Sequence, residues 1–257
     1  MSSYGEGHVA LYDSFYADKH YEDEAVFVAD CLKIAGVCPP ARLLELACGT
    51  ARHAVALERQ GFEVIGVDAS SGMLACARAR CEAAGSKVVL EHQDLRSLNL
   101  GGPSADAATC LFDSIGYLQT NEAIGSALLA IARHLRAGGV LVLEYWHAPA
   151  MLRGYEPVRV RRWVSAEREI IRISETTLEP SRNVAIVAYE ILEIRNGELV
   201  CRIRETQTNR YFLVQEMEIL LRQAGFEILQ HCDGFSSNGT IGLDTWHVVT
   251  VARRCNS

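Results

Sequence analysis

The sequence predicts an α/β protein with a doubly wound, mostly parallel sheet of seven strands and an antiparallel β insertion. Strand and helix patterns alternate from residue 42 to residue 146, which is typical of a parallel sheet with helices on both faces. Between residues 150 and 212 the pattern changes to an alternation of period two, as in antiparallel hairpins. One helix and two further strands then follow.

The first segment, residues 8–36, is predicted to be helical. Apolar residues recur there at three- and four-residue steps, and Gly36 is a suitable end for the helix. The segment is also rich in aromatic residues, although these make up only 7% of the chain. The residues alone leave two interpretations open, a helix packed on the core or a lid of rings over a pocket. Pro39-Pro40 then leads into the first strand.

The alternating region contains five predicted strands with helices between them. The strands are 42–47, 62–67, 87–91, 105–112 and 140–145. The first helix spans residues 50–60, and the second is capped by Ser70 or Ser71 and ends before Gly85. A third begins near Asn121 and ends at Gly138-Gly139.

The rest of the chain contains hairpins and then completes the sheet. Turns at 179–181 and 195–197 join the period-two runs, so residues 150–212 are predicted to be a small β insertion. Residues 214–224 form the last predicted helix, and 226–232 and 245–253 the last two strands. The chain thus divides into a helical segment (1–38), an α/β domain (39–149 and 213–257) and the insertion (150–212).

Composition excludes several classes of function. A net charge of −7 is unfavourable for a protein that binds the phosphate backbone of nucleic acids. No apolar run is long enough to span a bilayer, and residues 1–6 do not resemble a secretory signal. The nine cysteines contain no CxxC pair, so we expect reduced thiols in a cytoplasmic protein and no metal site.

Acidic residues end two neighbouring strands of the predicted sheet. In such sheets ligands bind at the carboxyl ends of the strands. Asp68 ends the second strand, where a carboxylate can bind the hydroxyls of a ribose, and Gln93-Asp94 ends the third, where it could bind an adenine amino group. The first strand ends in the turn from Glu45 to Ala51.

This turn disfavours a dinucleotide. A dinucleotide site requires three glycines, whereas Ala47, Gly49 and Ala51 occupy these positions and only one is glycine. Glu45 is also unfavourable beside a diphosphate and suits a cationic group such as an ammonium. The sequence therefore points away from a dehydrogenase.

Three segments resemble motifs of class I S-adenosylmethionine-dependent methyltransferases. They are 44–51 (LELACGTA), 66–74 (GVDASSGML) and 93–96 (QDLR), and 136–139 (RAGG) matches the usual end of the helix before the fifth strand. Alanines at 47 and 51 depart from the usual glycines. The resemblance implies S-adenosylmethionine as cofactor. It implies that the cofactor site contains Tyr16, Glu45, Ala47, Cys48, Gly49, Asp68, Ala69, Met73, Gln93, Asp94, Leu95 and Leu111.

A narrower resemblance covers most of the chain. Segments 10–16 (ALYDSFY), 46–50 (LACGT), 112–118 (FDSIGYL) and 144–146 (EYW), with the insertion, are similar to small-molecule N-methyltransferases of antibiotic biosynthesis that act on aminodeoxysugars or lincosamides. This resemblance implies a small-molecule amine as substrate and an N-terminal lid over the cofactor. It implies catalytic roles for Tyr4, Tyr12, Phe112 and Tyr117, whose rings would attract the sulfonium or the substrate ammonium.

Several alternatives stay open. Tyr12, Tyr117 or His147 could act as a base, although an amine needs no dedicated base and His147 could be purely structural. His53 and His92 receive no role. An O-methyltransferase is the main alternative, and a catalytically silent binding protein is a second. The insertion could wall off the substrate or join subunits, and we expect a homo-oligomer.

Overall fold

A computed structural model describes residues 5–101, 105–165 and 167–255 and confirms the predicted fold class. The larger sheet has seven strands in the order β10-β11-β5-β4-β1-β2-β3. Its strands are β1 (Arg42–Leu46), β2 (Glu63–Asp68), β3 (Val89–His92), β4 (Ala105–Cys110), β5 (Leu135–Trp146), β10 (Phe226–Asp233) and β11 (His247–Arg254). Among the described strands of this larger sheet, β11 is antiparallel to both of its neighbours, β5 and β10, and the other strand pairs are parallel. The strand order reverses between β1 and β4, which places a ligand site at their carboxyl ends.

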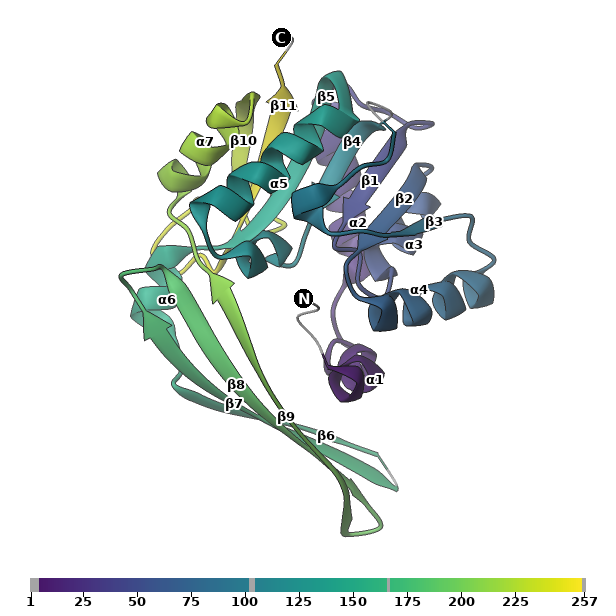
Figure 1. The fold of residues 1–257 in the computed structure, drawn as a ribbon, viewed down its shortest axis with the longest axis vertical. Coiled ribbons are helices and arrows are strands. Elements are labelled where there is room, and N and C mark those ends of the chain that lie inside the picture. Colours follow the sequence, from purple (N-terminus) through teal and green to yellow (C-terminus); the bar gives the residue numbers. More distant parts are fainter. Residues whose placement is uncertain (1–4, 102–104, 166, 256–257) are drawn as a thin grey trace.

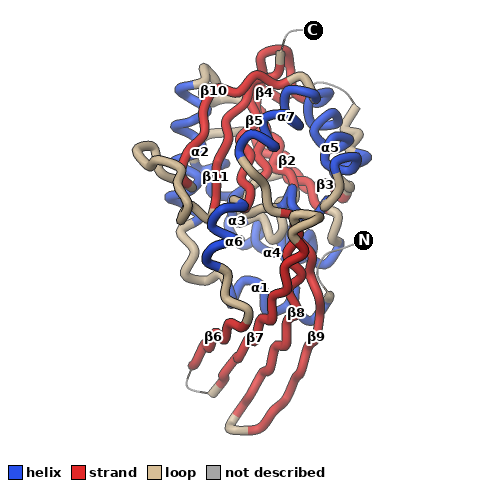
Figure 2. The backbone as a smooth tube through the Cα atoms, turned by 90° about the vertical axis from the view of Figure 1, so that its left-hand side faces the viewer, coloured by secondary structure: helices blue, strands red, loops and turns tan. Residues whose placement is uncertain are grey.

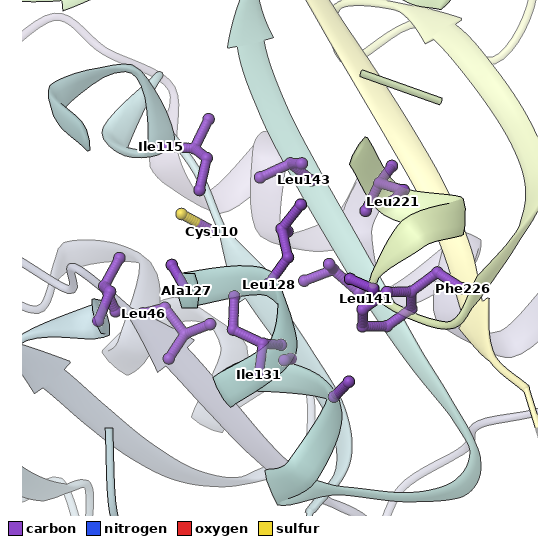
Figure 3. Close-up of a cluster of buried hydrophobic side chains, with 14 of the residues drawn as sticks. Leu46, Cys110, Ile115, Ala127, Leu128, Ile131, Leu141, Leu143, Leu221 and Phe226 are labelled. Atoms are coloured by element: carbon purple, nitrogen blue, oxygen red, sulfur yellow. The ribbon is translucent and has the colours of Figure 1, made fainter. Parts of the chain in front are cut away.

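Helices cover both faces of this sheet (Figure 1). They are α2 (Tyr21–Ile34), α3 (Arg52–Arg59), α4 (Ser71–Ala84), α5 (Asn121–His134) and α7 (Val214–Gln223), with 3-10 turns at η1 (Leu95–Ser97) and η2 (Ser114–Leu118). On one face, α5 and α7 bury Leu128, Ile131 and Leu221 against Leu141 and Leu143 of β5 (Figure 3). The other face packs against α2, α3 and α4.

A second sheet contains four antiparallel strands in the order β6-β7-β8-β9. These are β6 (Val158–Val164), β7 (Arg168–Glu179), β8 (Val184–Arg195) and β9 (Glu198–Arg210), which follow the short helix α6 (Ala148–Gly154). The turns expected at 179–181 and 195–197 join β7 to β8 and β8 to β9. Figures 1 and 2 show this sheet projecting from the α/β half, with helix α1 beside it.

The N-terminal segment differs from the prediction. Instead of one helix over residues 8–36, there are two, α1 (Glu6–Phe15) and α2, separated by residues 16–20. Each has its own partner, because Leu11 and Phe15 of α1 pack on the second sheet while Val28 of α2 packs on the larger one. Acidic residues at 22–24 complement the dipole at the start of α2.

The fifth strand also begins earlier than predicted. Helix α5 ends at His134, and β5 begins at Leu135, so Gly138-Gly139 lies within the strand rather than at the end of the helix. Leu135 is fully buried and pairs with Ala105 of β4, which accounts for the early start.

Candidate active site

The turn after β1 holds three residues in the left-handed conformation. Ala47, Gly49 and Ala51 have φ angles of 53°, 55° and 60°. For alanine this conformation costs roughly 1–2 kcal/mol. The turn therefore keeps the backbone path that glycines would adopt easily. A Cβ built on Gly49 meets no atom within 4 Å, so this backbone borders open space.

Asp68, at the end of β2, holds this turn in place. One carboxylate oxygen accepts a hydrogen bond from the Gly49 amide at 2.8 Å, and the other accepts from the Ser70 amide at 2.7 Å. Burial raises the pKa of Asp68, and these two amide bonds oppose that shift. The turn and the carboxylate thus form one rigid unit.

A cavity of about 470 Å³ opens at the carboxyl ends of the strands, and we refer to it as the main cavity. This volume is ordinary for a small-molecule site. The residues predicted from the sequence that line it are Tyr12, Ala47, Gly49, Asp68, Ala69, Met73, Gln93, Asp94, Leu95, Phe112 and Tyr117. Sequence reasoning missed eight others, which are Ser70, Arg96, Ser114, Leu118, Gln119, Thr206, Gln207 and Thr208.

A smaller cavity of about 40 Å³, the inner cavity, adjoins it and shares with it Tyr12, Ala47, Gly49, Phe112 and Ser114. Glu45, Cys48 and Leu111, all predicted as site residues, line the inner cavity. Tyr16 lines neither of these two cavities. Its ring instead packs on Tyr12 and Phe112, with centroids 4.8 and 4.9 Å away. Tyr4 lies outside the described residues.

Glu45 is buried at the end of β1 with an unsatisfied oxygen. Its Oε2 atom has no hydrogen-bond partner among the described residues, and burial, with Asp68 nearby, raises its pKa. Its Oε1 atom lies 3.9 Å from Nδ1 of His53, whose Nε2 lies 2.6 Å from Glu24. An orphaned acceptor in a small cavity suits a cationic donor, which fits the ammonium of S-adenosylmethionine.

Two residues of the third motif, Gln93 and Asp94, already bind other residues of the protein. The Gln93 side chain forms two hydrogen bonds with the Asn99 backbone. Its Nε2 donates to the Asn99 carbonyl at 3.0 Å, and its Oε1 accepts from the Asn99 N–H at 2.8 Å. Asp94 pairs with Arg96, whose guanidinium outweighs burial and lowers the pKa of Asp94 to about 2. Both residues line the main cavity, and their contact with an adenine stays a prediction.

Phe112 and Asp113 follow β4 in an unusual backbone conformation. Their φ angles are 59° and 54°, which is rare for side chains of this size and costs of order 1–3 kcal/mol each. The Glu144 carboxylate of β5 accepts from the Phe112 amide. The Asp113 carboxylate accepts from the Trp146 amide at 2.9 Å and from the Asn209 amide group at 2.8 Å. These bonds fix the Phe112 ring at the cavity.

Burial and neighbouring charges set the protonation of Asp113 and Glu144. Burial raises the pKa of Asp113 to about 8. Burial would also raise the pKa of Glu144, but His247, with Nδ1 2.8 Å from its carboxylate, and Lys19 outweigh it and hold that pKa below its usual range. Neither His247 nor Asn209 could be predicted, because no local pattern links them to Phe112.

His147, which the sequence left open as a base or a structural residue, lies outside both cavity linings. It is buried, its Nδ1 atom lies 3.1 Å from the Thr245 carbonyl, and burial lowers its pKa. His53, which received no role from the sequence, instead lines the inner cavity. Its partner Glu24 lies 29 positions away, so spacing alone gave no signal.

Residues of the insertion complete the main cavity. Thr206, Gln207 and Thr208 of β9 line it together with Tyr117 and Gln119 of the η2 region. The Tyr117 hydroxyl donates to the Gln207 side chain at 3.0 Å, and the Gln119 amide donates to the Thr208 carbonyl at 3.3 Å. The insertion is therefore part of the site.

The described part of the chain contains no group of three or more His, Cys, Asp or Glu side chains placed to hold a metal ion. None of its helices is long and apolar enough to cross a membrane.

Comparisons with known proteins agree with this geometry. Residues 43–139 match a family model described as a methyltransferase domain. The whole-chain fold is that of a solved S-adenosylmethionine-dependent methyltransferase from Clostridium acetobutylicum, with a TM-score of 0.83, 22% identity, and coverage of 96% of this chain and 97% of that one. The chain therefore contains a methyltransferase domain over residues 43–139, within the fold of that solved S-adenosylmethionine-dependent enzyme.

Two relatives are similar over nearly the full length. One is the dTDP-3-amino-3,4,6-trideoxy-alpha-D-glucopyranose N,N-dimethyltransferase of Streptomyces venezuelae, 29% identical over 88% of this chain and 92% of that protein. The other is a solved amino pentose methyltransferase from Micromonospora echinaspora, 28% identical, with a TM-score of 0.76 and coverage of 95% and 96%. The chain thus resembles sugar methyltransferases of antibiotic biosynthesis.

Proposed function

We propose that this enzyme transfers a methyl group from S-adenosylmethionine to the amine of a small natural-product substrate, an amino sugar or a lincosamide-like precursor. The observation that carries the proposal is the composition of one part of the main cavity. Five uncharged hydrogen-bonding side chains gather there beside the aromatic rings, and they are Ser114, Gln119, Thr206, Gln207 and Thr208. Hydroxyls and amides of this kind suit the hydroxyls of a sugar. The two sugar-specific relatives support this assignment.

The cofactor would lie between the turn and the third motif. Asp68 and Glu45 would hold its ribose and ammonium, and Gln93, Asp94 and Leu95 would surround its base. Cys48, Ala69, Met73 and Leu111 would provide walls. When bound, S-adenosylmethionine would supply a methyl group on its sulfonium centre: a neutral amine would attack the methyl carbon in line, the carbon–sulfur bond would break, and S-adenosylhomocysteine would leave as the positive charge passes to the amine product.

The protein's part in such a reaction is alignment and exclusion of water. Tyr12, Phe112 and Tyr117 line the main cavity and would form an aromatic wall near the reacting atoms. Rings near a sulfonium or an ammonium contribute about 0.5–2 kcal/mol each. Tyr16 would act through its packing on Tyr12 and Phe112.

Nitrogen is favoured over oxygen as the acceptor. An alcohol requires a base, whereas a neutral amine is already a nucleophile. Among the described lining residues, the carboxylates Asp68 and Asp94 lie toward the expected cofactor end, and the histidine, His53, lies behind Glu45 in the inner cavity. No histidine is among the described residues that line the main cavity.

The test is a methylation assay by mass spectrometry. The enzyme is incubated with S-adenosylmethionine and a panel of nucleotide-linked amino sugars, free amino sugars and lincosamide-like amines, each paired with its hydroxy analogue. We expect a gain of one or two methyl groups on an amine and none on its hydroxy partner. Methylation of the hydroxy analogues alone would identify an O-methyltransferase. Cofactor binding without any transfer would identify a silent binding protein.

We further propose the arrangement in which this activity works. Residues 1–38 would form the lid, 39–149 and 213–257 the cofactor domain, and 150–212 the substrate wall and an interface between subunits. The exposed valines of β6 support self-association into a homo-oligomer. The nine free cysteines support a cytoplasmic enzyme, and the acidic net charge disfavours nucleic acids and anionic membranes as partners.

A further inference from the structure

A chain of hydrogen bonds leads from the main cavity into the insertion. The Tyr117 hydroxyl donates to Oε1 of Gln207 at 3.0 Å. The Gln207 amide group donates in turn to Oε1 of Glu205 at 2.7 Å. The other oxygen of Glu205 accepts from the Gly5 amide, just before α1, at 3.3 Å. Gln207 is buried, so its amide orientation is set by these neighbours and not by water.

The register of β9 brings the two insertion residues together. Glu205 and Gln207 are two positions apart on the same strand, so their side chains share one face of the sheet. They pair with Tyr189 and Val187 of β8. Tyr117 reaches this face from η2, which follows the strained Phe112-Asp113 step.

The donors and acceptors in this series of hydrogen bonds can be arranged in only one order. A carboxylate only accepts hydrogen bonds, whereas an amide has a donor end and an acceptor end. Glu205 therefore draws the NH₂ end of Gln207 toward itself and leaves the carbonyl end facing Tyr117. The Tyr117 hydroxyl must then donate its one proton to Gln207, so toward the main cavity, which Tyr117 lines, its oxygen can act only as an acceptor.

We propose that Glu205 and Gln207 are positioning residues that make the Tyr117 hydroxyl a hydrogen-bond acceptor for the substrate amine. An amine whose N–H is held by the tyrosine oxygen has its lone pair at another corner of the nitrogen, available to attack the methyl group. This inference rests on the proposed function, because it requires an amine acceptor in the main cavity.

A double-mutant cycle with Glu205→Gln and Tyr117→Phe tests the proposal. Glutamine at position 205 no longer forces the orientation of Gln207, so the Tyr117 hydroxyl can turn toward the amine as a donor. We expect kcat for the amine to fall about tenfold in Glu205→Gln, with the Kd for S-adenosylmethionine within about twofold of wild type by calorimetry. In the Tyr117→Phe background, Glu205→Gln should change kcat less than about twofold, because no hydroxyl remains to orient.

The matched control is Glu198→Gln, which removes the same charge from an exposed position on the same strand and should leave kcat unchanged. If Glu205→Gln fails to bind the cofactor, Gln207→Met replaces it in the cycle with the same expectations, since it removes the acceptor for Tyr117.

The outcomes separate the two proposals. Independent, multiplicative effects of Glu205→Gln and Tyr117→Phe on an enzyme that methylates amines would overturn the positioning role and leave the proposed function standing. A wild-type enzyme that methylates no amine would overturn the proposed function and the inference together.

Discussion

Asp68 supports the turn after β1 and also lines the main cavity. Its two carboxylate oxygens accept the Gly49 and Ser70 amides, and its side chain also lines the main cavity. The hydrogen bonds explain how a turn with alanine at positions 47 and 51 keeps left-handed angles at both. Loss of the carboxylate should therefore affect the empty enzyme as well as cofactor binding.

For Asp68→Ala we expect cofactor binding weakened by roughly 1–3 kcal/mol, because a hydrogen-bonding partner of the ribose is lost. The Tm of the enzyme without cofactor should also fall, because two amides lose their acceptor. Calorimetry and thermal unfolding measure the two effects. Glu63→Ala, which removes an exposed acid from the same strand, is the control. Unchanged affinity in Asp68→Ala would contradict the ribose assignment.

Asp113 makes stability depend on pH. Its pKa rises from 3.8 to about 8 on folding because burial disfavours the charged form. Between these two values the folded state binds more protons than the unfolded state, so the free energy of unfolding falls as pH rises. This group's contribution is lost as pH rises through about 8.

The comparison of wild type with Asp113→Asn isolates this effect. Asparagine does not titrate and can still accept the Trp146 amide. Between about pH 5 and pH 8, the slope of the free energy of unfolding should be less steep in the variant, by up to about 1.4 kcal/mol per pH unit. Urea unfolding at several pH values measures it. Parallel curves for the two proteins would show that Asp113 does not titrate in this range.

At the scale of elements, α1 links the second sheet to α4 and to the turn after β1. Leu11 and Phe15 pack on the second sheet, with Phe15 5.1 Å from the Trp163 ring, while Val9 and Tyr12 pack on Met73 of α4. Asp13 accepts from the Thr50 hydroxyl at 2.9 Å, which ties α1 to the turn of the cofactor site. A single helix thus contacts the insertion, α4 and the turn.

Phe15→Ala should release α1 from the second sheet. Truncation of a buried phenylalanine costs about 3–5 kcal/mol of packing, here concentrated between α1 and the insertion. We expect weaker cofactor binding and faster proteolysis at residues 16–20, with little change in the unfolding of the larger sheet.

Limited proteolysis measures the rate of cleavage at residues 16–20, and calorimetry measures cofactor affinity, in wild type and in Phe15→Ala. Ile34→Ala, on an exposed position of α2, should leave both unchanged. Cofactor affinity equal to wild type in Phe15→Ala would argue against the lid.

The larger sheet could be predicted from the sequence because its information is local. Each strand–turn–helix unit has its own apolar period and its own end signals, so the sequence alone places Asp68 and Gln93 at the carboxyl ends of their strands. The packing of α1 and the insertion is not local. A period of two shows that Thr206 and Gln207 point to opposite faces, but not that Gln207 meets Tyr117, which is 90 positions away. The break after Phe15 was missed for the same reason, since distant partners decide it.

At the scale of the whole molecule, β6 is an edge strand with exposed apolar side chains. Val158, Val160 and Val164 lie two and four residues apart and so share one face, with Arg162 between the last two, and Val160 is 61% exposed. Such surfaces on soluble proteins commonly bind another chain. A second copy of the enzyme is the partner we expect.

Val160→Glu should weaken this association. A charge in an apolar interface must be desolvated, so the variant should sediment as a smaller species than wild type. Leu243→Glu, at a 60% exposed position in the loop before β11, is the matched control and should sediment like wild type. A wild-type enzyme that sediments as a monomer would remove the homo-oligomer from the proposal.

Strand β9 has a consequence beyond the shape of the cavity. It carries Gln207, which lines the main cavity, and it belongs to the sheet of the proposed interface; its Asn209 donates to Asp113, the residue after Phe112. A ligand that shifts this strand would change the association constant, and association would change ligand affinity by the same factor, because such coupling is reciprocal. The enzyme would then respond to its own concentration, with acceptor affinity set by how much of it is assembled.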